Sequence, residues 1–509
     1  RKKDNIRDMK ITFTGHAGLL IETNDVNILC DPWHSDNPAF FKTWSVYPDN
    51  RNLDWDKIIS KTDILFVSHI HEDHFDKKFL KRLHSKNKEV KVLIPNFRYD
   101  VLKNKLKKIG FNDFITEELN IGNTTAVTYC SEKIDRERED SSICVDDGNL
   151  TFLNWNDSTF TPENKEDIMN RFKKIDWATG QFSGATWWPT CYNYTEEKKQ
   201  GFISQFKERK VSHYEGMIDY LGVKKIIPTA GPSCFLQKNM YHLNYFDDNP
   251  SVFFDCWDVP EFDDMKEVYR IMPGDEFTYD TIQDRKIRPF DKREYILKNQ
   301  YSVDYTLDDD KLKSIDELIL KKFPSLLENN SWLKKYIKSK IYISVKNYKS
   351  FCLDFRKQTV EIVDEPIRKG AWYIINIEQK IIYTLLSKNI DDWENAAFLS
   401  NTCVFERNPD TFNPWIVSFF RNLDNDRLQK IYDIVQSSEV LEGKMVVGDY
   451  EIDRYCVHQQ YDLLYHGEFN EEEKTMTCLG HGWIWDLESC EGINCNAKIV
   501  CKKIVRKSA

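Results

Sequence analysis

Residues 68–76 read SHIHEDHFD and directly follow the run DILFV at 63–67. Branched and aromatic residues without polar interruption are typical of a strand that is buried on both faces. A loop after such a strand would bring several potential metal ligands into one pocket: His69, His71, Asp73 and His74. Three of the chain's 11 histidines fall in this short loop, which argues against a solvated segment that is histidine-rich by chance. Because imidazole and carboxylate together suit zinc, iron or manganese better than calcium, the segment predicts a transition-metal site at the end of a strand.

The composition is that of a globular protein with several domains. At 509 residues, the chain is long enough for about two to four domains. The charged fraction of 30%, the net charge of −10 and the lack of a basic block argue against nucleic-acid binding. No stretch approaches the 18 apolar residues of a membrane span, so we expect no membrane partner.

The cysteines and the N-terminal residues bear on the compartment. RKKDNIRDMKITF, at the start, lacks the apolar core of a signal peptide. The 13 cysteines form no dense, evenly spaced framework. In a chain of this size without a secretion signal, thiols are expected to stay reduced, as core residues or metal ligands. We therefore expect a cytoplasmic protein.

Strand and helix patterns alternate through the first 280 residues. Patterns typical of strands occur at 11–33, 63–67, 89–95, 124–130, 141–155 and 224–228. Helical spacing occurs between them, at 76–86, 101–110 and 212–222. This alternation, with potential ligands at strand ends, predicts an α/β layered domain.

The motif H-x-H-x-D-H after an apolar strand resembles the signature of the metallo-β-lactamase fold. That resemblance implies an αβ/βα sandwich with one or two metals at its edge. It also implies a further ligand at a later strand end, and LNWND (153–157) supplies Asp157 there. By this similarity, Asp157 would be the carboxylate that bridges two metals.

Two histidines that zinc hydrolases of this fold usually carry are missing from the expected segments. The hairpin before Asp157 reads CSEKIDREREDSS (130–142), and the last strand runs into IIPTAGPSCF (226–235). Four carboxylates are candidates for the hairpin position: Glu132, Glu137, Glu139 and Asp140. We favour Glu132. His16 and His242 could also substitute for the missing histidines, but we expect both to be structural or to support a ligand. A site with more carboxylate and less imidazole favours iron over zinc.

Aromatic segments carry a narrower resemblance. HAGLLIE (16–22), LCDPWHSDNPAFFKTW (29–44), QFSGATWWPTCY (181–192) and TAGPSCF (229–235) resemble the branch that contains CMP-N-acetylneuraminate hydroxylase and UDP-N-acetylmuramate hydroxylase. These enzymes oxidise an N-acetyl methyl group to N-glycolyl on a nucleotide-linked sugar. The resemblance implies that aromatic side chains stack on a sugar or base, unless they pack in the core instead: Trp187, Trp188 and Tyr192.

The last 70 residues carry a second ligand pattern. Cys456-x-His458 is followed, after nineteen residues, by Cys478-x-x-His481. Two cysteines and two histidines in this order could hold zinc. The loop CLGHGWIWDL (478–487) instead resembles a Rieske domain, in which two Cys hold one iron and two His the other iron of a [2Fe–2S] cluster. This resemblance leaves other nearby residues without a ligand role: His466, Cys490, Cys495 and Cys501.

These patterns together predict three domains. We expect a metallo-β-lactamase-fold oxygenase domain over 1–285, a connecting α+β region over 286–437 and an all-β Rieske domain over 438–509. A [2Fe–2S] cluster carries single electrons, which hydrolysis does not need. The combination therefore predicts an iron-dependent monooxygenase with one or two iron ions in its first domain and O2 as co-substrate. It would take electrons from an external donor such as a ferredoxin, a reductase or a cytochrome b5-like protein.

The sequence leaves open the identity of the substrate and two further classes of function. The substrate would be a small molecule, either an N-acyl amino sugar linked to a nucleotide or a natural-product amine. The sialic-acid hydroxylases carry their Rieske domain at the N-terminus, and the reversed order here weakens the inference to a sugar. The competing classes are a metal-dependent hydrolase of the same superfamily with an appended redox cluster, and a non-catalytic redox sensor. The sequence does not indicate an oligomeric state.

Overall fold

The computed structural model describes the chain as two compact units. The first contains residues 1–190 and 194–303, and the second contains 191–193 and 304–509. Structural statements below refer to all residues except 1–8, 98–99, 132–139, 159, 161, 245, 247–253, 260–266, 283–290, 438–442, 458–462, 464–466, 479–482, 496 and 505–509. Among the described residues, no helix has the length and apolar character needed to cross a membrane.

The first unit contains a seven-stranded sheet in the order β16-β1-β2-β3-β5-β6-β7. Its antiparallel part is β1 (Lys10–Gly15), β2 (Gly18–Glu22), β3 (Asn27–Cys30) and the edge strand β16 (Glu276–Phe277). The parallel part continues from β3 into β5 (Ile64–Phe66), β6 (Lys91–Ile94) and β7 (Phe114–Thr116). The buried strand predicted before SHIHEDHFD is β5, whose three residues are all buried. A two-stranded sheet pairs β4 (Trp44–Ser45) with β14 (Cys234–Phe235).

A second seven-stranded sheet has the order β15-β13-β12-β11-β10-β9-β8. Its antiparallel strands are β8 (Glu118–Ile121), β9 (Thr124–Ser131), β10 (Asp140–Asp146) and β11 (Thr151–Asn156). Its parallel strands run from β11 to β12 (Trp177–Gln181), β13 (Lys225–Thr229) and β15 (Glu267–Val268). The sheets face each other across one apolar core, in which Phe13, Leu19 and Phe66 of the first sheet join Ile143 and Phe152 of the second.

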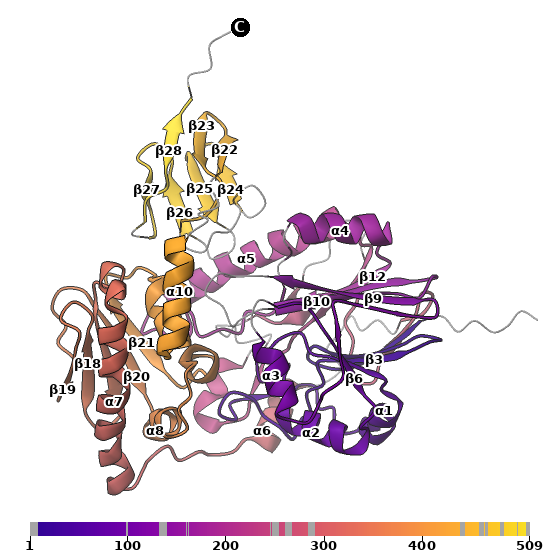
Figure 1. The fold of residues 1–509 in the computed structure, drawn as a ribbon, viewed down its shortest axis with the longest axis horizontal. Helices are drawn as coiled ribbons and strands as arrows, with labels where there is room; N and C mark the ends of the chain where they lie inside the picture. The colour runs from indigo at the N-terminus through magenta and orange to yellow at the C-terminus, as the bar shows by residue number, and fades with distance from the viewer. Residues whose placement is uncertain are drawn as a thin grey trace, which may run out of the picture. The chain divides into compact units, whose positions relative to one another are not determined.

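Helices cover the outer faces of both sheets. α1 (Trp55–Lys61), α2 (Lys77–Lys86) and α3 (Val101–Lys107) bury their apolar residues against β5 and β6, in a cluster that includes Leu65, Phe79 and Val92. α4 (Pro162–Phe172) and α5 (Glu196–Leu221) lie on the far side, next to the sheet that contains β9, β10 and β12 (Figure 1). α6 (Lys292–Asn299) also belongs to this unit. The predicted αβ/βα sandwich is therefore confirmed.

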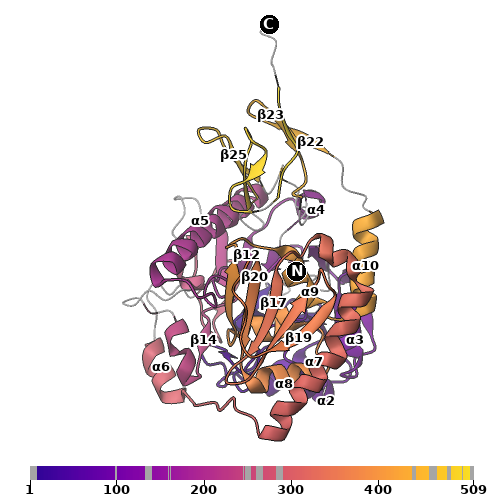
Figure 2. The same cartoon turned by 90° about the vertical axis from the view of Figure 1, so that its left-hand side faces the viewer.

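The second unit contains a five-stranded sheet with helices beside it (Figure 2). Its strands are β17 (Lys340–Val345), β18 (Ser350–Asp354), β19 (Thr359–Val363), β20 (Trp372–Ile377) and β21 (Val404–Asn408). Its helices are α7 (Asp309–Asn329), α8 (Gln379–Ser387), α9 (Pro414–Arg421) and α10 (Asn425–Ser437). This matches the α+β character predicted for the middle of the chain.

Two small sheets follow in the same unit. One has the order β22-β23-β28, with β22 (Lys444–Val447), β23 (Tyr450–Asp453) and β28 (Cys501–Lys503). The other has the order β24-β25-β26-β27, with β24 (Gly467–Asn470), β25 (Thr475–Cys478), β26 (Trp483–Asp486) and β27 (Glu491–Gly492). Residues of both sheets share one apolar core, which includes Ile452, Met476 and Trp485. This part of the chain is all-β, as predicted.

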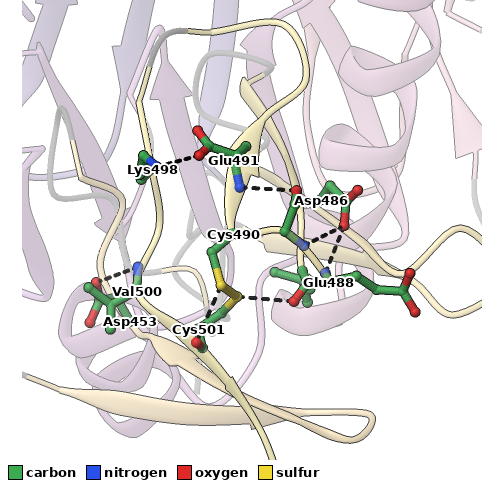
Figure 3. The surroundings of a disulfide bond; sticks show 10 residues. Asp453, Asp486, Glu488, Cys490, Glu491, Lys498, Val500 and Cys501 are labelled. Carbon is green, nitrogen blue, oxygen red and sulfur yellow. Dashed lines mark hydrogen bonds and ion pairs between the residues drawn. A yellow bond between two sulfur atoms is a disulfide. The ribbon is translucent and has the colours of Figure 1, made fainter.

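One cysteine pair departs from the expectation of reduced thiols. Cys490 and Cys501 form a disulfide. Cys490 directly precedes β27 and Cys501 begins β28, so the bond joins the four-stranded sheet to the three-stranded sheet (Figure 3). A hydrogen bond from Val500 N to Asp453 Oδ2 at 3.1 Å ties the segment before β28 to β23 (Figure 3). The expectation is wrong for this pair, while the other 11 cysteines, all within the described residues, form no disulfide.

We expect the variant Cys490→Ser/Cys501→Ser to be less stable in these two sheets by about 2–4 kcal/mol, because the cross-link restricts the unfolded chain. Hydrogen exchange measured by mass spectrometry should show faster exchange in β23, β25 and β26 of the variant, and of the wild type treated with dithiothreitol. Cys130→Ser, at a half-buried cysteine of β9 that forms no disulfide, is the control and should leave these strands unchanged. Equal exchange with and without dithiothreitol would contradict a structural role for the bond.

Candidate metal centre

Polar side chains from both sheets of the first unit meet where the strands end. His16 lies in the tight turn between β1 and β2, and residues 68–74 follow β5. Asp140 begins β10 and Asp157 follows β11, and these positions are neighbours because β10 and β11 are antiparallel. The turn after β1 needs glycine, since a Cβ at Gly18 would lie 2.3 Å from Thr14 Oγ1. The ends of β1, β5 and β11 and the start of β10 thus bring these side chains to one edge of the sandwich.

His69, His71 and Asp157 form the first of two clusters, with ligand atoms within 4.8 Å of one another. His69 Nε2 lies 2.8 Å from His71 Nδ1 and 4.0 Å from Asp157 Oδ2. Asp140 Oδ1 lies 3.9 Å from the same nitrogen of His69. Both histidines are buried, so the cluster is largely shielded from water.

His16, Asp73 and His74 form the second cluster, with ligand atoms in the same range. His16 Nε2 lies 2.9 Å from Asp73 Oδ2, and His74 Nε2 lies 3.6 Å from that oxygen. Asp157 Oδ2 is 3.7 Å from His74 Nε2 as well as 4.0 Å from His69 Nε2. Its carboxylate therefore lies between the two clusters, in the place of a bridging group.

The charges of the second cluster are strongly coupled. Burial disfavours the charged form of His74, but the carboxylates of Asp157, Asp73 and Asp31 raise its pKa to about 10. Burial would also raise the pKa of Asp73, but the charges of His74 and His16 hold it well below its usual range. Burial raises the pKa of Asp157. A proton on His74 thus supplies positive charge among these carboxylates, and a metal ion bound there would displace it.

Buried polar atoms without hydrogen-bond partners indicate that the residues of the two clusters fit a metal ion. Buried polar atoms in proteins are nearly always hydrogen-bonded, and exceptions call for an explanation such as a bound ion. Among the described residues, three buried atoms of the two clusters have no hydrogen-bond partner: Asp73 Oδ1, His74 Nε2 and Asp157 Oδ1. All three are atoms through which Asp and His coordinate metals.

Asp31, the residue after β3, holds ligands of both clusters in position. Its fully buried carboxylate accepts a hydrogen bond from His74 Nδ1 at 3.0 Å, which directs Nε2 towards the second cluster. It also accepts from Ser68 Oγ at 2.6 Å, and that oxygen lies 2.9 Å from His69 Nδ1. Such outer contacts fix ring orientation and tautomer in metal sites.

The candidates for the two missing histidine positions differ in where the structure places them. Glu132, Glu137 and Glu139 lie outside the described residues, whereas Asp140 lies beside His69. His16, which we expected to be structural or supporting, contributes to the second cluster. His242 is in the short 3-10 helix η1 (Lys238–Leu243) and belongs to neither cluster. His16 lies between Gly15 and Gly18, where the structure gives it a left-handed backbone with φ of 57°.

The aromatic candidates belong to different units of the structure. Trp187 is buried in the first unit, and Trp188 packs on Phe202 of α5 with ring centroids 5.1 Å apart. Tyr192 belongs to the second unit, where the segment Cys191–Asn193 pairs with β21 through Phe405 N and Phe405 O. Its ring stacks on Phe405, and its hydroxyl lies 2.7 Å from that of Tyr373. These contacts are typical of core packing.

An aromatic residue that was not singled out approaches the metal centre instead. The ring of Phe40 is buried and lies 6.2 Å from that of His71, centroid to centroid. Its N–H donates to Glu72 Oε2 at 2.6 Å. Phe40 begins three consecutive residues with positive φ, a backbone conformation that L-residues seldom adopt and that often accompanies function. Phe40 thus provides an apolar wall beside the first cluster.

Of the C-terminal ligand candidates, the structure describes the two cysteines. Cys456 follows β23 and Cys478 ends β25, so the two cysteines come from different sheets. Both are fully buried in the shared core of the two sheets. His458, His466 and His481 lie outside the described residues.

Comparisons with known proteins find matches along most of the chain. Residues 10–150 match the family described as "Beta-lactamase superfamily domain", and residues 315–436 match "Rv3818-like, SCP2-like domain". A protein of Mycobacterium tuberculosis (strain ATCC 25618 / H37Rv) is 30% identical over 518 residues, which cover 94% of this chain and 97% of that protein. A protein of Mycolicibacterium smegmatis is 30% identical over 519 residues, with the same coverage. The names of both describe a Rieske 2Fe-2S iron-sulfur protein.

The chain belongs to this Rieske-named family. The sandwich of its first unit is the metallo-β-lactamase fold, as H-x-H-x-D-H predicted. Outside the family, cytidine monophosphate-N-acetylneuraminic acid hydroxylase of Asterias rubens is 24% identical over 220 residues, 41% of this chain and 32% of that enzyme. The Rieske-named relatives are therefore similar along the whole chain, and the hydroxylase is similar over less than half of it.

Proposed function

We propose that this protein is a Rieske-coupled, iron-dependent monooxygenase. The observation that carries the proposal is the pair of adjoining clusters with Asp157 between them, on a chain that also has Cys456 and Cys478 in one core. Relatives along the full length are named for a Rieske 2Fe-2S centre, and the partial relative is named a hydroxylase. A hydrolase would have no use for a one-electron carrier on the same chain.

Two iron ions are the metals we assign to the centre. His69, His71 and Asp140 would hold one ion. His16, Asp73 and His74 would hold the other, and Asp157 would bridge them. Three carboxylates among seven donors make a harder, more anionic set than the imidazole-rich sites that zinc prefers, which favours iron. The [2Fe–2S] cluster would be held by Cys456, His458, Cys478 and His481.

Iron in the centre would supply the reduction of O2, with electrons from the Rieske cluster and an external donor, and the oxidation of a C–H or N–H bond. The protein's own residues prepare the site for this chemistry. Asp31 holds the His74 ring by its Nδ1, and through Ser68 it also positions His69. The Phe40 ring shields His71 from water, and exclusion of water protects reactive species from side reactions.

The substrate that we propose is a small molecule, either a nucleotide-linked N-acyl amino sugar or a natural-product amine. The similarity to the Asterias rubens hydroxylase over 220 residues supports the sugar, because that enzyme is named for a CMP-linked sugar. The limited coverage of 32% of that enzyme keeps the amine in the proposal.

Metal analysis of protein produced with iron tests this function. We expect about four iron ions per chain, two of them in the cluster, and a Rieske-type electron paramagnetic resonance signal after reduction with dithionite. His69→Ala should lose the iron of the first unit and keep this signal, since the cluster ligands lie in the second unit. Reductant-dependent O2 uptake should fall to background in that variant. Zinc in both places, with no signal after reduction, would contradict the proposal and favour a hydrolase.

A further inference from the structure

The strand that leads to Asp157 has a bulge just before it. Asn154 of β11 is paired with Thr179 of β12. The next pair is Asn156 with Gly180, so β11 has one extra residue between the two pairs. Asn156 has a left-handed backbone with φ of 55°, a conformation that asparagine adopts more readily than most L-residues. Since a bulge bends its strand and re-aims the side chains that follow, the end of β11 leaves the regular sheet where it enters the metal centre.

The side chain of Asn156 crosses from the second sheet to the first. Its Nδ2 donates a hydrogen bond to Asp31 Oδ2, and Asp31 follows β3 of the first sheet. Because an ionised carboxylate is only an acceptor, the amide atom that faces it is the nitrogen. Asn156 is 1% exposed and Asp31 is fully buried, so water does not compete for this bond. The bond therefore ties the end of β11 to the end of β3 inside the sandwich.

Backbone contacts fix the position from which Asn156 reaches across. Its N–H donates to Asn154 Oδ1 at 3.2 Å. The same oxygen accepts a hydrogen bond from Thr179 Oγ1 of β12 at 3.0 Å. Both partners are buried. These bonds hold the bulged end of β11 next to β12, so the Asn156 amide approaches Asp31 from a fixed strand end.

Asp31 is an acceptor that several groups of the metal centre share. Besides Asn156, its Oδ2 accepts from His74 Nδ1 at 3.0 Å and from Ser68 Oγ at 2.6 Å. Its Oδ1 accepts from Ser68 N at 2.7 Å. On the other side of the bond, Asn156 is followed directly by Asp157, whose carboxylate lies between the two clusters. The Asn156–Asp31 bond thus joins ligands that are carried by different sheets.

We propose that Asn156 is a positioning residue of the metal centre. Through its bond to Asp31, it holds the strand end that carries Asp157 in place against the ligands of the first sheet. A bridging carboxylate has to reach two ions, so its placement relative to both clusters determines how tightly they are bound. The two-ion arrangement rests on the proposed function, whereas the effect of Asn156 on metal binding does not. Asn156 lies outside the H-x-H-x-D-H motif and was not among the candidate ligands.

Metal binding by two variants of the full-length protein tests this inference. Asn156→Asp keeps the size of the side chain and tolerates a left-handed backbone, but it puts a second carboxylate beside Asp31 in place of the donor. Asn156→Gly also tolerates this backbone and removes the side chain. Equilibrium dialysis against Mn²⁺, after chelation of the resident metal, should show about 10- to 100-fold weaker binding to both variants than to wild type. That is the usual effect of changing a group that orients a ligand.

A spectroscopic measurement on the iron-loaded protein separates positioning from a general loss of stability. In the oxidised protein, a [2Fe–2S] cluster and a coupled pair of ferric ions both lack an electron paramagnetic resonance signal, whereas an isolated ferric ion gives one. Asn156→Asp and Asn156→Gly should show the signal of isolated ferric iron, and wild type should not. The reason is that a displaced Asp157 leaves the ions uncoupled or one position unfilled.

Asn244→Asp is the matched control. Asn244 is a buried asparagine of the same unit, and its amide bonds Phe235 N and Phe235 O, both at 2.9 Å. The variant should unfold at a lower temperature, because the buried Phe235 carbonyl loses a donor, and its Mn²⁺ affinity and spectrum should match wild type. If Asn156→Gly binds Mn²⁺ as tightly as wild type, the inference is overturned. It is also overturned if Asn244→Asp loses as much metal affinity as the Asn156 variants.

The result can be distinguished from failure of the proposed function. If the purified protein holds zinc and shows no Rieske signal, the oxygenase is wrong, yet weaker Mn²⁺ binding by both Asn156 variants still supports the positioning role. If iron and the Rieske signal are present but both variants bind Mn²⁺ as wild type does, the oxygenase stands and this inference falls.

Discussion

Replacing Cys456 with serine should abolish multiple turnover and remove the [2Fe–2S] cluster, while the iron of the first unit stays bound. A Rieske cluster needs the thiolate charge and geometry at this position. The first unit builds its own core from two sheets and should fold without the cluster. Iron content should therefore fall by about two ions per chain, and the Rieske-type signal of the reduced protein should disappear.

A second cysteine provides the control for this variant. Cys495 is buried in the same core as Cys456, and its pKa is raised to about 11 by burial. We assign it no ligand role, so Cys495→Ser should keep the cluster signal and turnover. Loss of the cluster in Cys495→Ser but not in Cys456→Ser would show that the ligand assignment is wrong.

The dependence on O2 decides between the two enzyme classes. Water is the only co-substrate of a hydrolase, so its rate would survive both the loss of the cluster and the removal of O2. Wild type and Cys456→Ser should therefore be compared with and without O2 and a reductant. Product formed by Cys456→Ser without O2 would end the oxygenase hypothesis and favour the hydrolase.

Replacing Asp157 with alanine should remove metal from both clusters of the first unit, with a loss of metal affinity of about 100-fold or more. Changes to groups that merely support a ligand already cost about 10- to 100-fold, and Asp157 itself lies between the clusters. Metal analysis should show about two ions fewer per chain, and the Rieske signal should persist because its ligands are in the second unit.

Asp176→Ala is the matched control for Asp157→Ala. The Asp176 carboxylate accepts a hydrogen bond from Thr151 N at 3.0 Å, at the opposite end of β11. Its removal should lower stability slightly and leave the metal content unchanged. Full metal content in Asp157→Ala would refute the bridging role and would require another carboxylate, such as Asp140, to supply it.

Features that depend on neighbours along the chain could be predicted from the sequence. His69, His71, Asp73 and His74 follow a buried strand within a few residues, so a short loop keeps all four at the same edge of the sheet. The alternation of strand and helix patterns predicted an α/β layered domain, and the resemblance of H-x-H-x-D-H to the metallo-β-lactamase signature implied the sandwich. Cys456 and Cys478 were likewise recognisable from local spacing, and both are buried in one core.

Features that depend on long-range packing were decided only by the tertiary structure. His16 approaches Asp73 across 57 residues, and Asp140 approaches His69 across 71, because sheet order and the register of β10 on β11 bring distant turns to one edge. Tyr192 joined the second unit through pairing with Phe405, and Cys490 met Cys501 across two sheets. Hydrophobic periodicity fixes which face of an element is buried, but it does not encode which elements become neighbours. The sequence by itself therefore determined the local ligand loops and the fold class, and only the packed sheets decided which distant residues complete the two clusters.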